Sequence, residues 1–464
     1  MSHTNLARQL LGSLLSALAV ACAVAPRADA RQAKPFDFAE LDKTVEAELK
    51  AGHTPGAAVA VVSGDRVVYA RGFGVTSAEE GGGAVTPDTL FRMGSTTKML
   101  TAAALVTLAS EGKIRLDAPV GNFVKGLPPR VAALTPHQLL SQSSGLRDFA
   151  PAATSDDDAA LAKNIRAWND DVFFTEPNSI YSYSSPNYWL AGFVVEELTG
   201  RVYADAMRDL VFKPLGMGRT TLRPLEAMTY PLALGHNVQP GGAVVIRPIP
   251  NNVAKYPGGS VYSSVSELAR FAVAMLNGGR LEGRQALPPL VVEELPKPQF
   301  YLPGEGRAFY GYGLLGFESG GVRVVSHGGV SSGYGSTIMF APGYRLAVIV
   351  LTNRNGETLP RTRQRAMQLA LPLKPDPAEQ PKPQPPGADE LKRYAGKYTH
   401  APQTWEVFVK AGKLFLKEDG KEFELTKLGR ERYGYEQGEV LFVPDARGAV
   451  GHIFMGLYAA RRSQ

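Results

Sequence analysis

The 464-residue sequence contains a single cysteine, Cys22, and this scarcity excludes several classes of protein. A disulfide framework needs paired cysteines, and no group of cysteines and histidines has the spacing of a metal site. The chain also lacks a long basic block: 50 basic and 44 acidic residues leave a net charge of +6, spread along the sequence. This pattern gives no support to nucleic-acid binding. With 44% hydrophobic and 20% charged residues, the composition is that of a globular protein.

Only one long apolar stretch occurs, at residues 10–25, and it is short for a membrane span. Small residues follow at Ala28 and Ala30, where a signal peptidase cleaves. We therefore predict a signal peptide over residues 1–30, export to the periplasm or beyond, and no membrane span. Cys22 lies inside this signal, so the mature chain has no thiol for catalysis. Lipid attachment at Cys22 is the less favoured alternative, because alanine stands three residues before it where lipoprotein signals usually have leucine.

Hydrophobic patterns predict one sheet built from both ends of a domain over residues 31–371. Residues 38–49 have helical spacing, and residues 56–70 form a hairpin whose first strand is apolar on both faces. A second helix is expected over residues 96–110. The residues that follow mix short helices with turns, and strand patterns then return at 322–326, 336–340 and 346–351. The predicted fold is α/β (α+β): an antiparallel sheet flanked by helices, with a mostly helical subdomain.

The composition changes sharply at residues 372–387, where seven of 16 residues are proline. Such a segment is typical of an extended, semi-rigid linker. Residues 388–464 then alternate in short segments punctuated by glycines, which predicts a small antiparallel β domain. The expected strands are 405–410, 413–417, 422–427, 440–443 and 450–458.

The chemistry of the chain is indicated first by Ser95-Thr-Thr-Lys98, at the start of the second helix. A serine hydroxyl needs a base to become a nucleophile, and residues three apart share one face of a helix. The helix N-terminus adds N–H groups suited to an oxyanion. About one or two S-x-x-K sequences are expected by chance in a chain this long. The other one, at Ser110, is broken by a glycine and reads as a helix end.

Six segments in order resemble the serine β-lactamase-like hydrolases, a family that includes class C β-lactamases, D-alanyl-D-alanine carboxypeptidases, D-aminopeptidases and esterases. The resemblance covers about residues 38–371, and the tail is similar, more weakly, to the lipocalin-like domain appended to some members. The matching segments are Pro55-Gly-Ala-Ala-Val-Ala-Val, Thr89-Leu-Phe-Arg-Met-Gly-Ser-Thr-Thr-Lys98, Leu139-Leu-Ser-Gln-Ser-Ser-Gly-Leu146, Tyr181-Ser-Tyr-Ser-Ser-Pro-Asn-Tyr188, Pro257-Gly-Gly-Ser-Val-Tyr-Ser-Ser-Val-Ser-Glu-Leu-Ala-Arg-Phe271 and His327-Gly-Gly329.

The resemblance implies roles for individual residues. Ser95 is the nucleophile, and Lys98 and Tyr183 form a coupled acid–base pair, in which the proton is assigned to neither. The N–H groups of Ser95 and Val330 form the oxyanion hole, and the strand at His327, Gly328 and Gly329 binds substrate. No cofactor or metal is implied.

Three residues depart from the family pattern. Gln142 stands in place of a histidine, and two further differences bear on the substrate. Ser185 stands where the family has asparagine, and offers one hydroxyl in place of an amide. His327 stands where many β-lactamases and carboxypeptidases have lysine, and a histidine can be neutral at pH 7. Both differences should weaken the turnover of β-lactams and of D-Ala-D-Ala peptides relative to the hydrolysis of activated esters.

The sequence thus predicts an exported serine hydrolase that cleaves an ester or amide of a small molecule or short peptide. Two alternatives stay open: a D-amino-acid peptidase, carboxypeptidase or β-lactamase, and a non-catalytic penicillin-binding or scaffold protein. The C-terminal domain either shapes the substrate entrance or contacts the cell envelope.

Overall fold

The computed structural model describes residues 37–150, 154–304, 306–374, 385–445 and 447–463. The predicted signal peptide, with Cys22, lies outside these residues, as does most of the predicted linker. The described part of the chain after residue 36 belongs to one unit. No helix within that part is both long and apolar enough to span a membrane.

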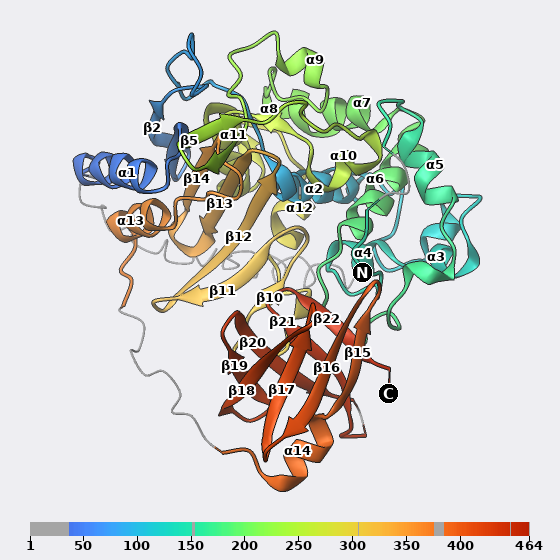
Figure 1. Cartoon of the computed structure of the whole chain (residues 1–464). Helices are drawn as coiled ribbons and strands as arrows, with labels where there is room; N and C mark the ends of the chain where they lie inside the picture. Colours follow the sequence, from blue (N-terminus) through green and yellow to red (C-terminus); the bar gives the residue numbers. More distant parts are fainter. Residues whose placement is uncertain (1–36, 151–153, 305, 375–384, 446, 464) are drawn as a thin grey trace, which may run out of the picture. The chain divides into compact units, whose positions relative to one another are not determined.

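The main sheet is antiparallel and has eight strands in the order β2-β1-β14-β13-β12-β11-β10-β9 (Figure 1). Strands from residues 56–74 pair with strands from residues 346–352, so the prediction of one sheet built from both ends is confirmed. The strands are β1 (Gly56–Ser63), β2 (Arg66–Gly74), β9 (Phe300–Tyr301), β10 (Phe309–Tyr310), β11 (Leu315–Ser319), β12 (Val322–Ser331), β13 (Tyr334–Ala341) and β14 (Leu346–Thr352).

Helices cover both faces of this sheet because its central strands are apolar on both sides. Val59 and Val61 of β1 pack with α1 (Ala39–Ala51) and α13 (Pro360–Ala370). Ala58, Ala60 and Val62 join the larger cluster that holds α2 (Thr97–Ser110) and α11 (Val265–Leu276). A strand buried on both faces is expected to be uniformly apolar, as this one is.

The residues between the two halves of the sheet are mostly helical, as the sequence predicts (Figure 1). Two helices, α2 and α6 (Ser185–Thr199), pack together at the centre and are buried along most of their lengths. The others are short: α3 (Pro129–Ala132), α4 (Pro136–Leu140), α5 (Ala160–Arg166), α7 (Tyr203–Met207), α8 (Lys213–Leu215), α9 (Pro224–Ala227), α10 (Tyr256–Gly259) and α12 (Pro289–Glu294).

The C-terminal domain is a closed barrel of eight antiparallel strands, preceded by α14 (Ala388–Tyr394). The sequence predicts only five of these strands. It misses two, and it merges the last two into one segment although a turn at Gly456 and Leu457 separates them. The strands are β15 (Gly396–His400), β16 (Gln403–Lys410), β17 (Lys413–Glu418), β18 (Lys421–Gly429), β19 (Arg432–Tyr435), β20 (Gly438–Pro444), β21 (Val450–Met455) and β22 (Tyr458–Arg462).

The barrel interior is filled by aromatic rings. Tyr394 stacks on Phe442 with ring centroids 4.1 Å apart, and Tyr433 and Tyr398 pack edge-on against the same phenylalanine. All four rings are buried. A closed barrel of eight strands is just wide enough for side chains to fill, as they do here.

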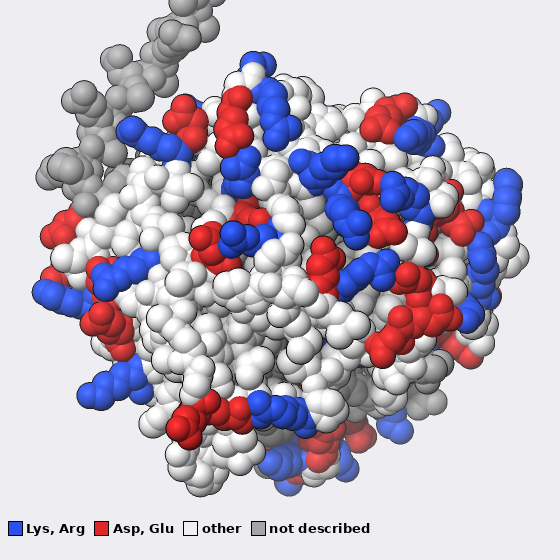
Figure 2. Space-filling view, turned by 90° about the horizontal axis from the view of Figure 1, so that it is seen from above, with Lys and Arg blue, Asp and Glu red and all other residues white. Residues whose placement is uncertain are grey.

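The charged residues are mixed on the surface. On the face drawn in Figure 2, lysines and arginines lie beside aspartates and glutamates instead of forming one basic patch. Exposed ion pairs occur among the described residues, such as Arg247 with Glu79. The face drawn in Figure 2 therefore shows no concentration of charge of one sign.

Candidate active site

Ser95 lies in a single 3-10 turn, Gly94–Thr96, that leads into α2. Gly94 has φ +56°, and a Cβ atom at this position would lie 2.5 Å from the carbonyl oxygen of Val330. Only glycine fits such a close approach at positive φ. The turn is therefore held directly against strand β12, with Ser95 partly exposed beside it.

Lys98 is fully buried on the first turn of α2 and reaches Ser95 as the sequence spacing predicts. Its Nζ donates to Ser95 Oγ at 3.1 Å, to the carbonyl oxygen of Gly258 at 2.7 Å, and to Ser185 Oγ at 3.4 Å. Burial lowers the pKa of the Lys98 ammonium to about 7, against the opposing effect of the nearby Asp148 carboxylate. Burial thus favours the neutral amine, and a neutral amine accepts protons.

Tyr183 faces the same ammonium. Lys98 Nζ lies 4.8 Å from the centre of the Tyr183 ring, and the phenol hydrogen-bonds to Ser95. Burial raises the pKa of the phenol well above its usual value, and the hydrogen bond to Ser95 only partly opposes this rise. Desolvation thus favours the neutral form of both groups, an amine and a phenol, over an ammonium and a phenolate.

Ser185 begins α6, and its hydroxyl lies within reach of Lys98. Asn187, two residues further on, does not take the place of the family asparagine. It is buried and donates to Gln142 Oε1 at 2.6 Å, while its own oxygen accepts from Ser144. Its amide is therefore committed to the core of the helical subdomain.

His327 lies in the middle of β12, not at the strand end that its two following glycines suggest. The strand continues to Ser331 because residues 327–331 pair with β13 after β11 has ended opposite Ser326. Gly329 is required there, since a Cβ atom would lie 2.0 Å from the carbonyl oxygen of Met93. Gly328 has no such restriction, with nothing closer to a Cβ than 3.9 Å.

Both ring nitrogens of His327 form hydrogen bonds. Nδ1 lies 2.6 Å from the carbonyl oxygen of Gly328, which only accepts, so Nδ1 carries the proton. Nε2 therefore accepts from the Tyr310 hydroxyl, 3.0 Å away. Burial and the charge of Lys98 lower the pKa of His327 to about 3. The imidazole is neutral and has no free N–H for a substrate carboxylate.

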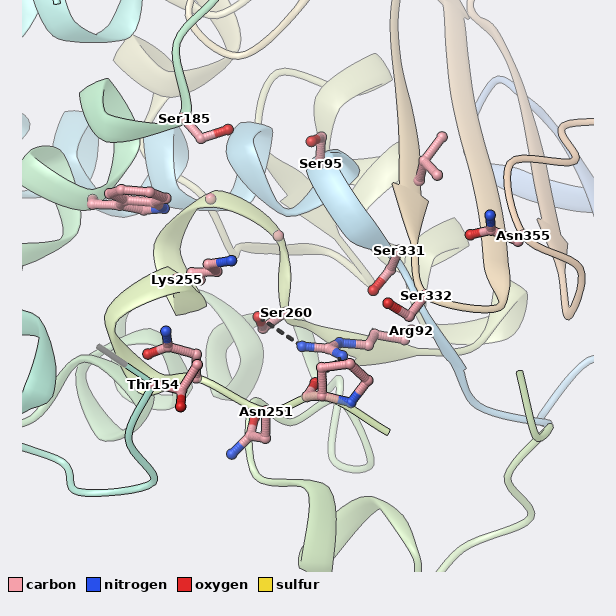
Figure 3. Close-up of a pocket in the computed structure, with 16 residues that line it drawn as sticks. Arg92, Ser95, Thr154, Ser185, Asn251, Lys255, Ser260, Ser331, Ser332 and Asn355 are labelled. Carbon is pink, nitrogen blue, oxygen red and sulfur yellow. Dashed lines mark hydrogen bonds between the residues drawn. The ribbon is translucent and has the colours of Figure 1, made fainter. Parts of the chain in front are cut away.

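Two cavities meet at Ser95 and Val330. The first has a volume of about 460 Å³ and is lined mainly by hydroxyl, amide and basic side chains together with Ser185 and Gly258 (Figure 3). The second, of about 380 Å³, is lined by aromatic and aliphatic side chains beside His327 and Gly328. We name them the polar cavity and the aromatic cavity.

The barrel contributes to the aromatic cavity, which sequence reasoning missed. Leu457 and Tyr458, at the turn between β21 and β22, line it together with Tyr181, Tyr183 and Tyr310. The backbone N–H of Tyr183 donates to the Leu457 carbonyl at 2.9 Å, and the Tyr458 ring packs edge-on against the Tyr183 ring. No sequence signal marks Tyr458, because its position depends on closure of the barrel.

Asp148 is a second residue that the sequence analysis did not identify. Its Oδ1 accepts from the Ser185 N–H at 2.9 Å and so caps the start of α6. Its own N–H donates to Nε2 of His400, a barrel residue, at 2.9 Å. Asp148 follows the Leu139–Leu146 motif by two positions, which is the signal that pointed to its neighbourhood.

Comparison with known proteins identifies the family and the fold of the chain. The β-lactamase family model matches residues 41–371. Penicillin-binding protein 4 of Amycolatopsis lactamdurans is 31% identical over 337 residues, covering 69% of this chain and 86% of that protein. The solved structure of SurE, also determined with D-Leu, has a TM-score of 0.76 at 22% identity and covers 91% of this chain and 98% of SurE. A β-lactamase/D-alanine carboxypeptidase from Pseudomonas syringae has a TM-score of 0.60 at 20% identity and covers 72% of this chain and 100% of that chain.

Proposed function

Because the chain belongs to the β-lactamase family, whose fold is that of serine hydrolases, we propose that it cleaves an ester or amide through an acyl-enzyme on Ser95. The observation that carries this proposal is the buried Lys98 Nζ, 3.1 Å from Ser95 Oγ, with its pKa lowered to about 7. A base with a pKa near the working pH is the one best suited to take the serine proton.

The proton steps follow from the two desolvated groups. Neutral Lys98 takes the proton of Ser95 as Oγ attacks the carbonyl carbon. The Tyr183 phenol, which is protonated before the attack, gives its proton to the departing oxygen or nitrogen, and the Lys98 ammonium then returns a proton to the phenolate. The N–H groups of Ser95 and Val330 stabilise the negative charge on the carbonyl oxygen. Water then attacks the acyl-enzyme by the same proton path in reverse.

This chemistry also orients the substrate. The group that protonates the leaving atom must lie beside it, and Tyr183 lines the aromatic cavity. The leaving group therefore departs through the aromatic cavity, next to the barrel. The acyl group then occupies the polar cavity, beside Ser185.

We favour ester hydrolysis over β-lactam hydrolysis. A neutral His327 whose two nitrogens are engaged supplies no fixed cation for the carboxylate of a β-lactam. Ser185 supplies one hydroxyl where an amide would hold the acyl side chain at two points. Activated esters need less orientation and less protonation of the leaving group. The proposal includes export, because residues 1–30 have the pattern of a signal peptide.

The test is hydrolysis of p-nitrophenyl butyrate together with labelling by a fluorophosphonate probe, read by mass spectrometry. Ser95→Ala should abolish both and leave the circular dichroism spectrum unchanged. Ser110→Ala is the matched control, because the Ser110 hydroxyl only donates to the Thr107 carbonyl at the end of α2. Labelling of Ser95 without turnover of any ester, D-amino acid amide or nitrocefin would instead indicate a binding protein.

A further inference from the structure

We propose that the polar cavity binds a carboxylate on the acyl group of the substrate, with Arg92 and Lys255 as its counter-charges. This inference rests on the proposed acyl-enzyme function and adds the chemical class of the acyl group. It places the anion on the opposite side of Ser95 from His327.

The charged residues described in the wall of the polar cavity are all basic. Two of its lining residues, Arg92 and Lys255, are cationic, and among the residues described there is no aspartate or glutamate in its wall. The remaining wall offers hydroxyl and amide groups that can solvate an anion, including Thr154, Ser260 and Ser332. In Figure 3, Ser95 and Ser185 lie at one end, Arg92 and Asn251 at the other, and Lys255 between them.

Arg92 is a buried cation without a carboxylate. It ends strand β3 (Phe91–Arg92), where Nη1 donates to the Pro250 carbonyl at 2.7 Å and Nη2 to Ser260 Oγ at 3.2 Å. Its buried Nε has no hydrogen-bond partner, and no acidic group in the described part of the chain lies within ion-pairing distance. The guanidinium also lies over the Tyr262 ring, 5.8 Å from its centre. A guanidinium carries five N–H donors, so these contacts leave three donors and a full positive charge without an anionic partner. Buried charges are normally paired, and an anionic ligand would supply the pair.

Lys255 supplies a second, accessible cation. It ends a 3-10 turn, Val253–Lys255, and its side chain is exposed. Its ammonium makes no ion pair with any carboxylate that the structure describes. In Figure 3 the ammonium points into the cavity. Two unpaired cations around one cavity attract an anion more strongly than either does alone.

The anion belongs to the acyl group because of the orientation that Tyr183 imposes. The leaving group occupies the aromatic cavity, and the described residues of its wall include no lysine or arginine. A carboxylate is the anionic group of dicarboxylic and acidic amino-acid acyl chains. The substrate class is therefore an ester or amide of such an acid, with an apolar leaving group.

Binding can be measured without turnover on the Ser95→Ala protein. Monomethyl adipate carries one free carboxylate, and dimethyl adipate is its neutral match. Calorimetric titration at low salt should show at least ten-fold tighter binding of the monoanion, and the difference should shrink as salt is added. Lys255→Met should weaken monoanion binding about five-fold, Lys255→Arg should retain it, and Lys392→Met, at an exposed lysine of the barrel domain, should change nothing. Equal affinity for the two esters, or no detectable binding of the monoanion, would overturn the inference.

Turnover by the wild-type chain separates this inference from the proposed function. The substrates are p-nitrophenyl hydrogen adipate and its neutral methyl ester. Ser95-dependent hydrolysis of both with equal kcat/KM would leave the acyl-enzyme proposal standing and refute the carboxylate site. Tighter binding of the monoanion without hydrolysis of either ester would refute the acyl-enzyme proposal and retain the carboxylate site. The expected result is at least a ten-fold preference for the acid, reduced by Lys255→Met.

Discussion

The polar and aromatic cavities meet at one serine but are built from different parts of the chain. Every residue of the polar cavity lies between Arg92 and Asn355, within the segment that the β-lactamase family model matches. The aromatic cavity takes Leu457 and Tyr458 from the barrel, beyond the end of that match. On the proposed orientation, the family domain holds the acyl group and carries out the chemistry, while the appended barrel helps to choose the leaving group.

The interface between the barrel and the β-lactamase-like domain is packed with buried hydrophobic side chains. Ile180, Tyr181 and Tyr310 pack with Phe454 and Ala459 of the barrel in one buried cluster. The N–H of Ala459 donates to the Ser182 hydroxyl, next to the tether between Tyr183 and Leu457. The segment that carries Tyr183 is thus held from the barrel side, whereas the hydrogen bonds of Lys98 Nζ described above all go to residues of the β-lactamase-like domain.

The largest effects should come from the two groups that move protons for both cavities. Lys98→Ala and Tyr183→Phe should each lower kcat/KM by about 10²–10⁴-fold. The double substitution should cost little more than either one, because the groups act as a unit. Ester hydrolysis by the four proteins, with thermal melting as a check on folding, measures this. Multiplied losses in the double variant would show that the groups act independently.

Removal of the barrel should have the next largest effect, and on one cavity only. We predict that a chain ending at Lys374 folds, since the sheet and its helices have two hydrophobic clusters of their own. Acylation of Ser95 by a fluorophosphonate should persist at a lower rate, because Tyr183 has lost its tether. Discrimination among leaving groups should be lost. Failure of the fragment to fold would show that the barrel and core form one cooperative unit.

A point substitution sharpens the same comparison without cutting the chain. Tyr458→Ala should lower kcat/KM for acetyl esters of aromatic alcohols about 2–10-fold, the worth of one aromatic contact, and leave methyl acetate unchanged. Tyr344→Ala is the matched control at another exposed tyrosine, which lies outside both cavities. A uniform loss for both leaving groups would mean that Tyr458 acts on the catalytic groups instead of on the leaving group.

Replacing Ser185 and His327, which differ from the family pattern, tests the substrate class across both cavities. His327→Lys with Ser185→Asn should raise nitrocefin hydrolysis relative to ester hydrolysis, by adding a cation to the aromatic cavity and an amide to the polar one. The gain should be modest, because a lysine at 327 enters a buried site next to Lys98. Parallel kinetics on nitrocefin and p-nitrophenyl butyrate measure the ratio. Efficient nitrocefin turnover by the unmodified chain would contradict the expectation.

The sequence predicts what local patterns encode. Helix α2 lies within one residue of its predicted limits, because apolar residues occur on each of its turns and Gly112 follows closely. Strand β1 begins at the predicted start of the hairpin, and its apolar residues run without interruption to the polar turn at Ser63. Strand β12 extends five residues further than predicted, because pairing with β13 holds two glycines in an extended conformation. Strand β19 is missed because it has only four residues.

The protonation states of Lys98 and Tyr183 could not be predicted from the sequence, for a different reason. The motifs indicate that Lys98 and Tyr183 are neighbours, but not that both are buried, and burial sets the direction of both pKa shifts. The second partner of His327, Tyr310, comes from another strand. Tyr458 reaches the site across the barrel interface. Each of these contacts depends on how distant segments pack, which periodicity does not encode.

The smallest predicted effect concerns Asp148, which joins the barrel-side and core-side halves of the site. Its carboxylate opposes the fall in the Lys98 pKa that burial causes, so its charge favours the protonated, inactive ammonium. Asp148→Asn keeps an oxygen to accept the Ser185 N–H but removes the charge, and the Lys98 pKa should fall by less than about one unit. Because the neutral amine is the base, kcat/KM rises with pH through this pKa, and the variant should move that rise to lower pH with little change in the plateau. The pH profile of ester hydrolysis measures the shift, with Asp157→Asn, an exposed carboxylate paired with Lys163, as the matched control. An unmoved profile with a lowered plateau would mean that Asp148 serves only to cap α6, and a profile displaced to higher pH would contradict the sign of its charge effect.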